Sequence, residues 1–303
     1  MRFQKLDLNL LVALDALLQE CSVSLAADRL HLSQSATSSA LGRLRDYFGD
    51  DLLVLKGRAM VLTPRGEELI GPVRAVLDQI RSTIAVSQPF DPASSDRRLA
   101  ILASDYSVEV LLRPAMLAFE EEAPSMMFEI TPLGDDLVEE LQRGRADLLI
   151  TVDSAISTEH PSIQLYEDDY VVVGWSGNRT LAEPMTKELY ESLGHVVIRL
   201  GRQRLPSVEE WALKSRLVDR RVEVVAPTFA SVASIVAGSQ RIATMHRRHA
   251  QRAARSLPLK LMELPFAIPP IRQMAQWPSS SANDPAIAWL VERLHQIATS
   301  PDF

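Results

Sequence analysis

The stretch SLAADRLHLSQSATSSALGRLRDYFG, residues 24–49, decides the fold of the first part of the chain. A short amphipathic segment, 23–31, ends at His31-Leu32-Ser33, and Ser33 is a typical N-cap for a second helix that ends before Gly49. Apolar residues recur at helical spacing on that second helix, and they are Ala36, Ala40, Leu41, Leu44 and Phe48. Two helices joined by a short turn predict a helix-turn-helix, whose second helix enters the major groove of DNA.

The flanking segments extend this prediction. Leucines at helical spacing before it indicate an amphipathic opening helix, and they are Leu6, Leu10, Leu11, Leu14, Leu17 and Leu18. Residues 52–55 and 60–62 flank a turn and predict a small hairpin, or wing. Thr63-Pro64 then begins a long helix to about residue 86. Its narrow apolar stripe favours packing against a partner helix; the alternative is packing on its own domain.

The side chains opposite the apolar face of the second helix are candidates for contact with DNA. We expect them to be exposed, and they are Gln34, Ser35, Thr37, Ser38, Arg43 and Arg45. Lys56, Arg58 and Arg65 lie on or just after the hairpin, where a wing contacts phosphates or the minor groove. Gln pairs with adenine, and Arg pairs with guanine or phosphate. The alternative is a plain three-helix domain with a polar face.

Composition excludes several classes of protein. At 303 residues the length suggests about two domains, and 47% hydrophobic residues indicate a folded core. The net charge of −7 argues against nucleic acid, but residues 1–65 are nearly neutral, with eight Lys and Arg against seven Asp and Glu. The single cysteine, Cys21, excludes an internal disulfide and favours a buried structural thiol. Without a long apolar run or a signal peptide, we expect a cytoplasmic protein with no membrane contact.

The remainder of the chain alternates between strands and helices. Residues 88–98 form a linker, and the alternation that follows predicts parallel α/β sheets with ligands at the strand ends. The expected strands are 99–103, 126–131, 147–152, 165–175, 195–200, 221–226, 241–245, 259–264 and 271–276. So many strands exceed one compact sheet, so we expect two lobes and a cleft. The crossovers between them are strand 165–175 and the proline-rich segment 265–270.

Polar and aromatic residues at the ends of these strands are expected to line the cleft. The candidates are Ser104, Asp105, Tyr106, Arg199, Gly201, Thr228, Phe229, Met245 and His246. This mixture of aromatic, thioether, hydroxyl and imidazole groups suits a planar phenolic ligand. For Phe229 and Met245 the alternative is core packing, and for Arg199 it is a salt bridge with Glu209 or Glu210.

The sequence gives little support for metal binding, nucleophilic catalysis or nucleotide binding. His246 and His249 have half of a metal-binding spacing, but no carboxylate or thiol follows at ligand distance, so we expect a solvated helix start there. The run Arg247, Arg248, Arg252 and Arg255 is expected to be an exposed helix face. Trp175-Ser176-Gly177 does not match the nucleophile elbow, and neither nucleotide-binding glycine motif is present. We expect no catalytic residue, no metal and no cofactor.

The chain resembles the LysR-type transcriptional regulators. LDLNLLVALDALL (6–18) and the segment 24–69 are similar to the winged helix-turn-helix of that family. DPA (91–93), GHVVI (194–198), PSVEEW (206–211) and RIATMHRR (241–248) are similar to its NodD subgroup, which contains nodulation activators and regulators of aromatic and chloroaromatic catabolism. The similarity covers the whole chain.

The resemblance implies an α+β winged helix-turn-helix head at 1–63, a long dimerisation helix at 64–90 and a two-lobed α/β effector domain at 91–303, similar to periplasmic binding proteins. Lobe I would comprise about 91–168 and 269–303, and lobe II about 169–268. The DNA-binding residues carried over are Gln34, Ser35, Thr37, Ser38, Arg43 and Arg58, to which Lys56 of the hairpin is added. Ser35 and Ser39 stand where the family often has Pro and Arg, which puts the operator sequence in doubt and not the binding mode.

The function expected is therefore that of a regulator, an activator, that binds promoter DNA as a homodimer or homotetramer and responds to a small aromatic effector. Flavonoids, chlorinated hydroquinones, chlorophenols and salicylate-like compounds all fit the expected cleft. RNA polymerase is a further expected partner. The sequence does not distinguish an activator from a repressor. The alternative from another class is a ligand-binding clamshell or enzyme whose helical head binds a protein.

Overall fold

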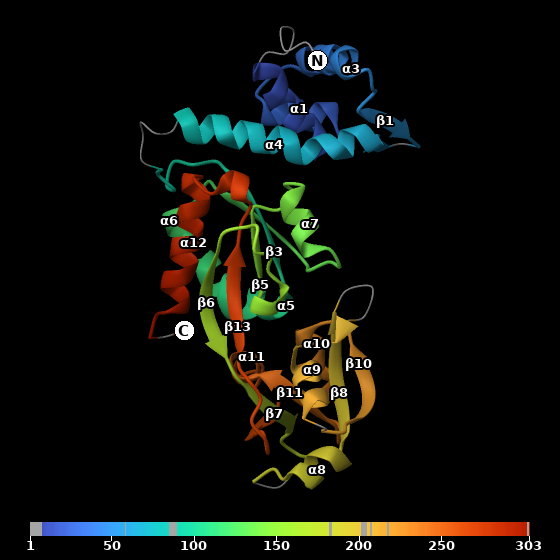
Figure 1. Cartoon of the computed structure of the whole chain (residues 1–303), viewed down its shortest axis with the longest axis vertical. Helices are drawn as coiled ribbons and strands as arrows, with labels where there is room; N and C mark the ends of the chain where they lie inside the picture. Colours follow the sequence, from blue (N-terminus) through green and yellow to red (C-terminus); the bar gives the residue numbers. More distant parts are fainter. Residues whose placement is uncertain are drawn as a thin grey trace.

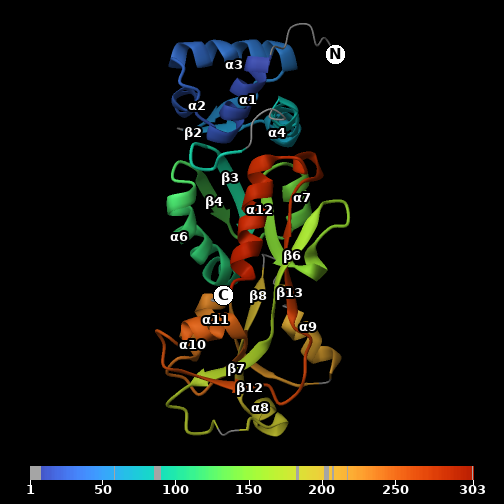
Figure 2. The same ribbon diagram turned by 90° about the vertical axis from the view of Figure 1, so that its left-hand side faces the viewer.

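The computed structural model shows three parts stacked along one axis: a helical head, a first α/β lobe and a second α/β lobe (Figures 1 and 2). The structure describes residues 8–57, 59–84, 90–181, 184–200, 205–206, 208–216, 218–301 and 303. Within that part of the chain no helix is both long and apolar enough to cross a membrane.

The head is formed as its sequence predicts. Its elements are α1 (Leu8–Glu20), α2 (Val23–Arg29), α3 (Gln34–Phe48), β1 (Leu53–Lys56), β2 (Ala59–Leu62) and α4 (Pro64–Ile84). Ser22 and Ser33 cap α2 and α3 through their side chains, and Gly49 ends α3 in the left-handed conformation. Thr63 accepts a hydrogen bond from the backbone N–H of Gly66 at the start of α4. These local caps explain why the helix boundaries were predictable.

The long helix α4 buries its apolar stripe within its own head. Leu69, Val73 and Leu77 join the hydrophobic core that α1 and α3 supply, and α1 is in contact with α4. For these three residues the covering helix is α1 of the same chain, which was the alternative prediction, and pairing of α4 with a second chain stays a prediction. Val76, on another side of α4, is 47% exposed.

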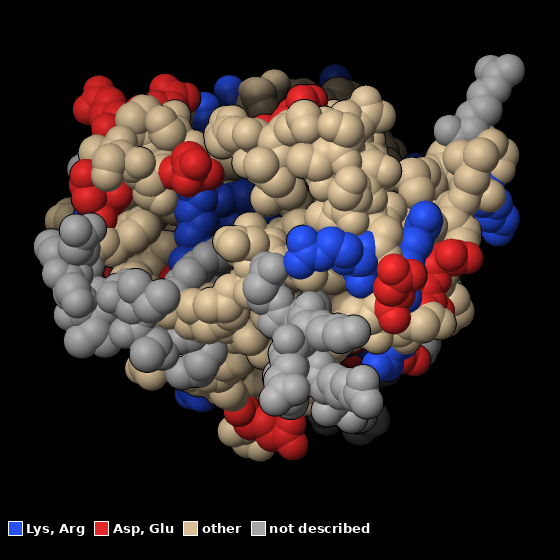
Figure 3. Space-filling model, turned by 90° about the horizontal axis from the view of Figure 1, so that it is seen from above, with Lys and Arg blue, Asp and Glu red and all other residues tan. Residues whose placement is uncertain are grey.

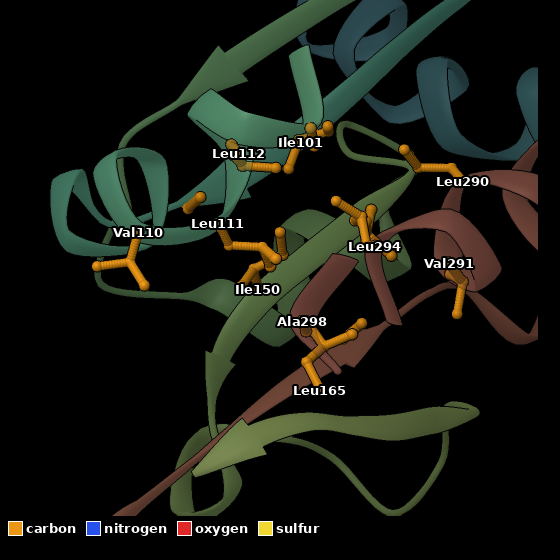
Figure 4. Close-up of a cluster of buried hydrophobic side chains, with 14 of the residues drawn as sticks. Ile101, Val110, Leu111, Leu112, Ile150, Leu165, Leu290, Val291, Leu294 and Ala298 are labelled. Atoms are coloured by element: carbon orange, nitrogen blue, oxygen red, sulfur yellow. The ribbon is translucent and has the colours of Figure 1, made fainter. Parts of the chain in front are cut away.

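Lobe I is built on a five-stranded sheet of order β4-β3-β5-β13-β6. Its strands are β3 (Arg98–Ala103), β4 (Met127–Thr131), β5 (Leu148–Val152), β6 (Ser162–Asp168) and β13 (Ile271–Gln276). Its helical segments are α5 (Asp105–Ser107), the π-helical turn η3 (Val108–Leu112), α6 (Arg113–Glu122), α7 (Leu137–Gln142), the 3₁₀ turns η4 (Asp153–Ala155) and η5 (Ser279–Ser281), and α12 (Pro285–Ala298). Figure 4 shows Leu290 and Leu294 of α12 among the buried side chains of this lobe.

Lobe II is built on a six-stranded sheet with the order β10-β8-β11-β7-β12, to which β9 adds beside β8. Its strands are β7 (Tyr170–Trp175), β8 (Gly194–Leu200), β9 (Leu205–Pro206), β10 (Arg221–Ala226), β11 (Ile242–His246) and β12 (Leu259–Glu263). Its helices are α8 (Lys187–Ser192), α9 (Val208–Ser215), α10 (Phe229–Val236) and α11 (Arg247–Ala253).

The crossovers lie where the sequence predicts, but two details differ. The expected single strand 165–175 is two strands, β6 and β7, which belong to different sheets. The sheets are also mixed and not parallel, because β6 and β13 pair antiparallel in lobe I while β11 and β12 both pair antiparallel with β7. A chain that crosses twice between the lobes returns in the opposite direction, and this reverses the strands next to each crossover.

Candidate functional site

The helix α3 presents a polar surface on the head. Gln34, Ser35, Ser38 and Arg43 are exposed, as the sequence predicts for a helix that reads DNA. The Ser33 side chain caps the N-terminus of the helix, and its hydroxyl lies 3.0 Å from that of Ser35. The cap and the short side chains leave the first turn open to an approaching nucleic acid backbone.

Thr37 does not belong to this surface. Its side chain is fully buried, with 0% exposure, and its hydroxyl donates to the backbone carbonyl of Ser33 at 3.2 Å. The expectation of an exposed Thr37 was wrong, and Ala36, predicted to be buried, is exposed. Thr37, Leu41 and Leu44 are spaced by four and three residues, so the buried stripe of α3 runs through position 37.

The hairpin beside α3 is held by an arginine. Arg45 donates to the backbone carbonyl of Asp51 at 2.8 Å and of Leu53 at 2.7 Å, which fastens the wing to the end of α3. Arg45, one of the expected exposed side chains, therefore has a structural role. Lys56 is exposed at the end of β1, whereas Arg58 lies outside the described residues.

The view of the head from above shows basic side chains in separate patches on a largely uncharged surface (Figure 3). This distribution agrees with the nearly neutral charge of the head. It also means that any phosphate contacts would come from a few dispersed side chains, such as the exposed Lys56.

A cavity of about 90 Å³ lies between the two lobes. Its wall contains five of the predicted residues: Ser104, Tyr106, Phe229, Met245 and His246. The other residues of the wall are Leu133, Thr151, Val152, Tyr170, Ile198, Glu209, Thr244, Ile271 and Gln273. A single water needs roughly 10–15 Å³ on this scale, and a cavity of about 150 Å³ binds benzene, so the space holds several waters as it stands and a ring enters only when the two lobes move slightly apart.

Three other predicted residues lie outside this wall and have other partners. The Asp105 carboxylate accepts a hydrogen bond from the backbone N–H of Ala230 at 2.8 Å, which joins lobe I to the start of α10 in lobe II. Thr228 is the N-cap of that helix, in a reciprocal capping box with Ser231. Arg199 pairs with Glu210 at 3.3 Å, which was the alternative prediction for it. Gly201 lies outside the described residues.

Aromatic rings form one side of the cavity. The ring centroid of Tyr106 lies 4.3 Å from that of His246 and 5.7 Å from that of Phe229. The Tyr106 hydroxyl donates to Asp168 at 2.8 Å, at the crossover between β6 and β7. Burial is the main reason that the pKa of Tyr106 lies well above 10 and that the pKa of Asp168 is raised to about 6. Tyr106 is thus a rigid, un-ionised wall residue.

Three buried polar atoms at the cavity have no hydrogen-bond partner among the described residues: Gln273 Oε1, Tyr170 Oη and His246 Nδ1. The other end of the Gln273 amide is fixed, since Nε2 donates to the Ser107 hydroxyl at 2.7 Å. Buried polar groups in proteins are nearly always hydrogen-bonded, so unpartnered ones around a cavity indicate a ligand or water. Sequence reasoning missed Gln273 and Tyr170. Gln273 is one of three polar residues in β13, and Tyr170 is the first residue of an apolar strand, so neither stands out in the sequence.

The histidine that ends β11 and the one that follows in α11 are both buried, so the expected solvated helix start was wrong. His246 and His249 are 8% and 1% exposed, and His249 Nε2 lies 3.1 Å from the Glu109 carboxylate of lobe I. Burial, with a smaller contribution from His249, lowers the pKa of His246 to about 3. Among the described residues no cluster of three metal-ligating side chains is found.

The arginines of α11 are not simply a solvated face either. Arg247 pairs with Asp169 at 2.7 Å and with Glu263 at 2.8 Å. The guanidinium of Arg248 lies 4.5 Å from the ring centroid of Phe303, and Arg252 donates to the backbone carbonyl of Val110. Arg248 and Arg252 therefore connect lobe II to lobe I, whereas the partners of Arg247 lie at the crossover and in lobe II.

The electrostatic character of the cavity follows from its wall. No Lys or Arg is present among the described residues that line it, and its one carboxylate, Glu209, is paired with Arg220. His246 is neutral at neutral pH because of its low pKa. An anionic ligand would therefore lose its hydration without gaining a cation.

Comparison with known families identifies the chain. Residues 8–67 match the family described as "Bacterial regulatory helix-turn-helix protein, lysR family", and residues 92–298 match the "LysR substrate binding domain". The chain belongs to the LysR family of transcriptional regulators. It is therefore a DNA-binding regulator and not an enzyme, and the alternative of a clamshell enzyme is set aside.

Known relatives are similar to this chain in sequence or in fold over nearly its whole length. The LysR chain is 44% identical to "Nodulation protein D 1" of Rhizobium tropici over 290 residues, which are 96% of this chain and 94% of the relative. A probable transcriptional regulator from Pseudomonas aeruginosa superposes with a TM-score of 0.78 at 30% identity, over 98% of this chain and 99% of that one. Full-length CbnR in complex with its target DNA has the same fold, with a TM-score of 0.53 at 15% identity, over 97% and 100% of the two chains.

Proposed function

We propose that this regulator binds a small, un-ionised phenolic effector in the cavity between its lobes and activates transcription in response. The observation that carries the proposal is the cavity wall, in which Tyr106 and Phe229 provide aromatic surface and Gln273, Tyr170 and His246 provide unpartnered polar atoms. A phenolic ring buries its faces against the aromatic groups while its hydroxyls bind these atoms.

The charge of the wall narrows the class of effector. Without a Lys or Arg in the described lining, a salicylate-like carboxylate is disfavoured relative to a neutral phenol, a chlorinated hydroquinone or a flavonoid. The relatives named "Nodulation protein D" support the assignment to a regulator of this subgroup. Of the nine predicted effector contacts, we propose the five that line the cavity, which are Ser104, Tyr106, Phe229, Met245 and His246. Asp105, Arg199 and Thr228 lie outside the wall, and Gly201 lies outside the described residues.

We also propose how the regulator meets DNA. Gln34, Ser35, Ser38 and Arg43 would face the major groove, and Lys56 with Arg58 would contact the backbone from the wing. The same proposal has three further parts. The chain divides into domains at residues 63 and 90, it binds promoter DNA in the cytoplasm as a homodimer or homotetramer, and it contacts RNA polymerase. The CbnR structure with its target DNA supports the binding of DNA by this fold.

Thermal melting of the full-length chain against a set of compounds tests the effector. The set contains neutral phenols, chlorinated hydroquinones, flavonoids and, as the matched anion, salicylate. A saturable rise in melting temperature with neutral phenolic compounds and none with salicylate is expected, because a ligand that binds only the folded state stabilises it. A rise with salicylate alone would overturn the proposed charge selection, and no rise with any compound would overturn the aromatic effector.

Binding to a DNA duplex selected from a random pool by the wild-type chain tests the surface. Arg43→Ala is expected to weaken binding, by about 10-fold or more if it contacts a base, and Lys56→Ala is expected to lower the salt dependence by about one ion. Arg145→Ala, in an exposed pair with Glu140 of the effector domain, is the control. Equal binding by all three variants would refute the assigned surface.

A further inference from the structure

The head is attached to lobe I by a close backbone contact. A Cβ added to Gly71 of α4 would lie 2.3 Å from the backbone oxygen of Arg143, and one added to Gly144 would lie 3.1 Å from the Gly71 Cα. Gly144 also has a φ of +65°, which favours glycine. Helix α4 and the loop after α7 therefore touch backbone to backbone, and any larger side chain would separate them (Figure 1).

A buried ion pair completes this contact. Arg74, three residues after Gly71 on α4, donates to the Gly144 carbonyl at 2.9 Å and to the Asp147 carboxylate at 2.7 Å. The Asp147 side chain is 3% exposed and also accepts from the backbone N–H of Ala100 at 2.7 Å. One guanidinium thus holds a loop and a carboxylate at once, in the fork geometry that only arginine provides.

The same contact is connected to the cavity by two strands. Ala100 lies in β3 and Asp147 immediately precedes β5, while Ser104 directly after β3 and Thr151 in β5 line the cavity. Four residues of extended chain span about 13 Å in each case. The ion pair and the cavity therefore lie at opposite ends of two adjacent strands.

We propose that Arg74 and Asp147 are positioning residues, which set the orientation of the DNA-binding head on lobe I and transmit occupation of the cavity to it. A shift at the cavity ends of β3 and β5 moves Ala100 and Asp147 together, and Arg74 carries that shift to α4. The second half rests on the proposed effector, whereas the first half does not. The salt bridge from Arg98 to Glu20, at 3.5 Å, adds a second link between the head and β3.

The angle that the bound protein imposes on DNA is the readout that a merely structural role would not move. The full-length chain is bound to the selected duplex with a fluorophore at each end, and energy transfer reports the bend. Gly71→Ala and Arg74→Met are expected to change the bend by 10° or more while the affinity stays within about threefold. Arg145→Met, which breaks an exposed pair on the same loop, is expected to change neither quantity.

Double variants and a compound separate the two halves of the proposal. If Arg74 acts through Asp147, the double variant Arg74→Met with Asp147→Asn bends DNA no differently from Arg74→Met alone, because the coupled changes do not add. The compound with the largest melting shift should alter the bend of the wild type and not that of Arg74→Met. If no compound shifts melting, the proposed function fails and the bend without compound still tests the positioning role.

Two outcomes would overturn the inference. Folded Gly71→Ala and Arg74→Met proteins that bend DNA like the wild type would show that the contact does not position the head. A compound response that survives intact in Arg74→Met would show that the signal does not pass through this pair. Gly71→Ala is expected to remain folded, since alanine is the better helix former.

Discussion

The two ends of the β3–β5 strand pair differ in how their buried polar groups are satisfied. At the head end, the Asp147 carboxylate accepts from both Arg74 and the Ala100 backbone. At the cavity end, Gln273 Oε1 and Tyr170 Oη have no partner among the described residues. A satisfied buried group contributes to the stability of the fold, whereas an unpartnered one costs stability until something binds it. The head end thus holds the two parts of the chain together, whereas the cavity end has buried polar atoms that remain without a partner among the described residues.

The largest effect is expected from breaking the satisfied end. Asp147→Ala removes both hydrogen bonds and leaves the Arg74 guanidinium half-buried without its carboxylate, so we expect the free energy of unfolding to fall by about 3 kcal/mol. Urea denaturation of the full-length chain measures this. Glu139→Ala, which breaks an exposed pair with Arg143, should cost under about 0.5 kcal/mol. Equal losses in the two variants would contradict the distinction between the ion pairs.

A second effect concerns pH at the cavity end. The pKa of His246 is about 3 in the folded chain, against the ordinary histidine value of 6.5 when the chain is unfolded, so below pH 6.5 the unfolded chain binds a proton that the native chain does not. Stability is therefore lost as pH falls, by about 1.4 kcal/mol per unit, or about 2 kcal/mol between pH 6 and pH 4.5.

The variant His246→Gln should lose this part of the acid sensitivity. Urea denaturation at pH 7, 6, 5 and 4.5 is expected to show a flatter decline than in the wild type. Gln251→Ala, at an exposed position of α11 without a titratable side chain, is the control and should keep the wild-type slope. A slope that is the same in all three proteins would indicate that His246 is protonated in the native chain at these values.

Capping and spacing signals in the sequence predicted where the helices of the head begin and end, but they did not predict which side chains the packing of the helices buries. Ser33 and Gly49 delimit α3 through interactions within a few residues. Which of Ala36 and Thr37 is buried depends on the rotation of α3 against α1. Both lie at helical spacing from Leu44, and the Thr37 hydroxyl favoured exposure of the residue that is in fact buried, so the sequence could not decide between them. The same holds for α4, whose stripe shows that it is buried but not what covers it.

For the cavity between the lobes, the sequence predicted the strand ends that line it but not which of its buried polar atoms lack a partner. Ser104 directly follows β3 and His246 ends β11, and both line the cavity. Tyr170 begins a strand that the sequence joins to the preceding one without a break, because the chain passes from one sheet to the other at Asp169 with no turn residue. Whether a buried polar atom has a partner is decided by segments far apart in the chain, which no local pattern reports.

The smallest effect distinguishes two tyrosines of the same wall. The Tyr106 hydroxyl donates to Asp168 at 2.8 Å, whereas the Tyr170 hydroxyl has no partner among the described residues. Tyr106→Phe should therefore lower the free energy of unfolding by about 1.5 kcal/mol, since a buried acceptor loses its donor. Tyr170→Phe should leave it unchanged or raise it by up to about 1 kcal/mol, since it removes a buried polar atom with no partner.

Thermal melting with the phenolic compounds is a second measurement that compares Tyr106→Phe with Tyr170→Phe. Tyr170→Phe should keep its stability and lose part of the melting rise, because the hydroxyl that remains free in the unliganded chain is the one available to a ligand. Urea denaturation without compound and melting with compound together decide the matter. A Tyr170→Phe chain that is destabilised as much as Tyr106→Phe would mean that its hydroxyl already has a partner, and the contrast between the two ends of the strands would lose its clearest case.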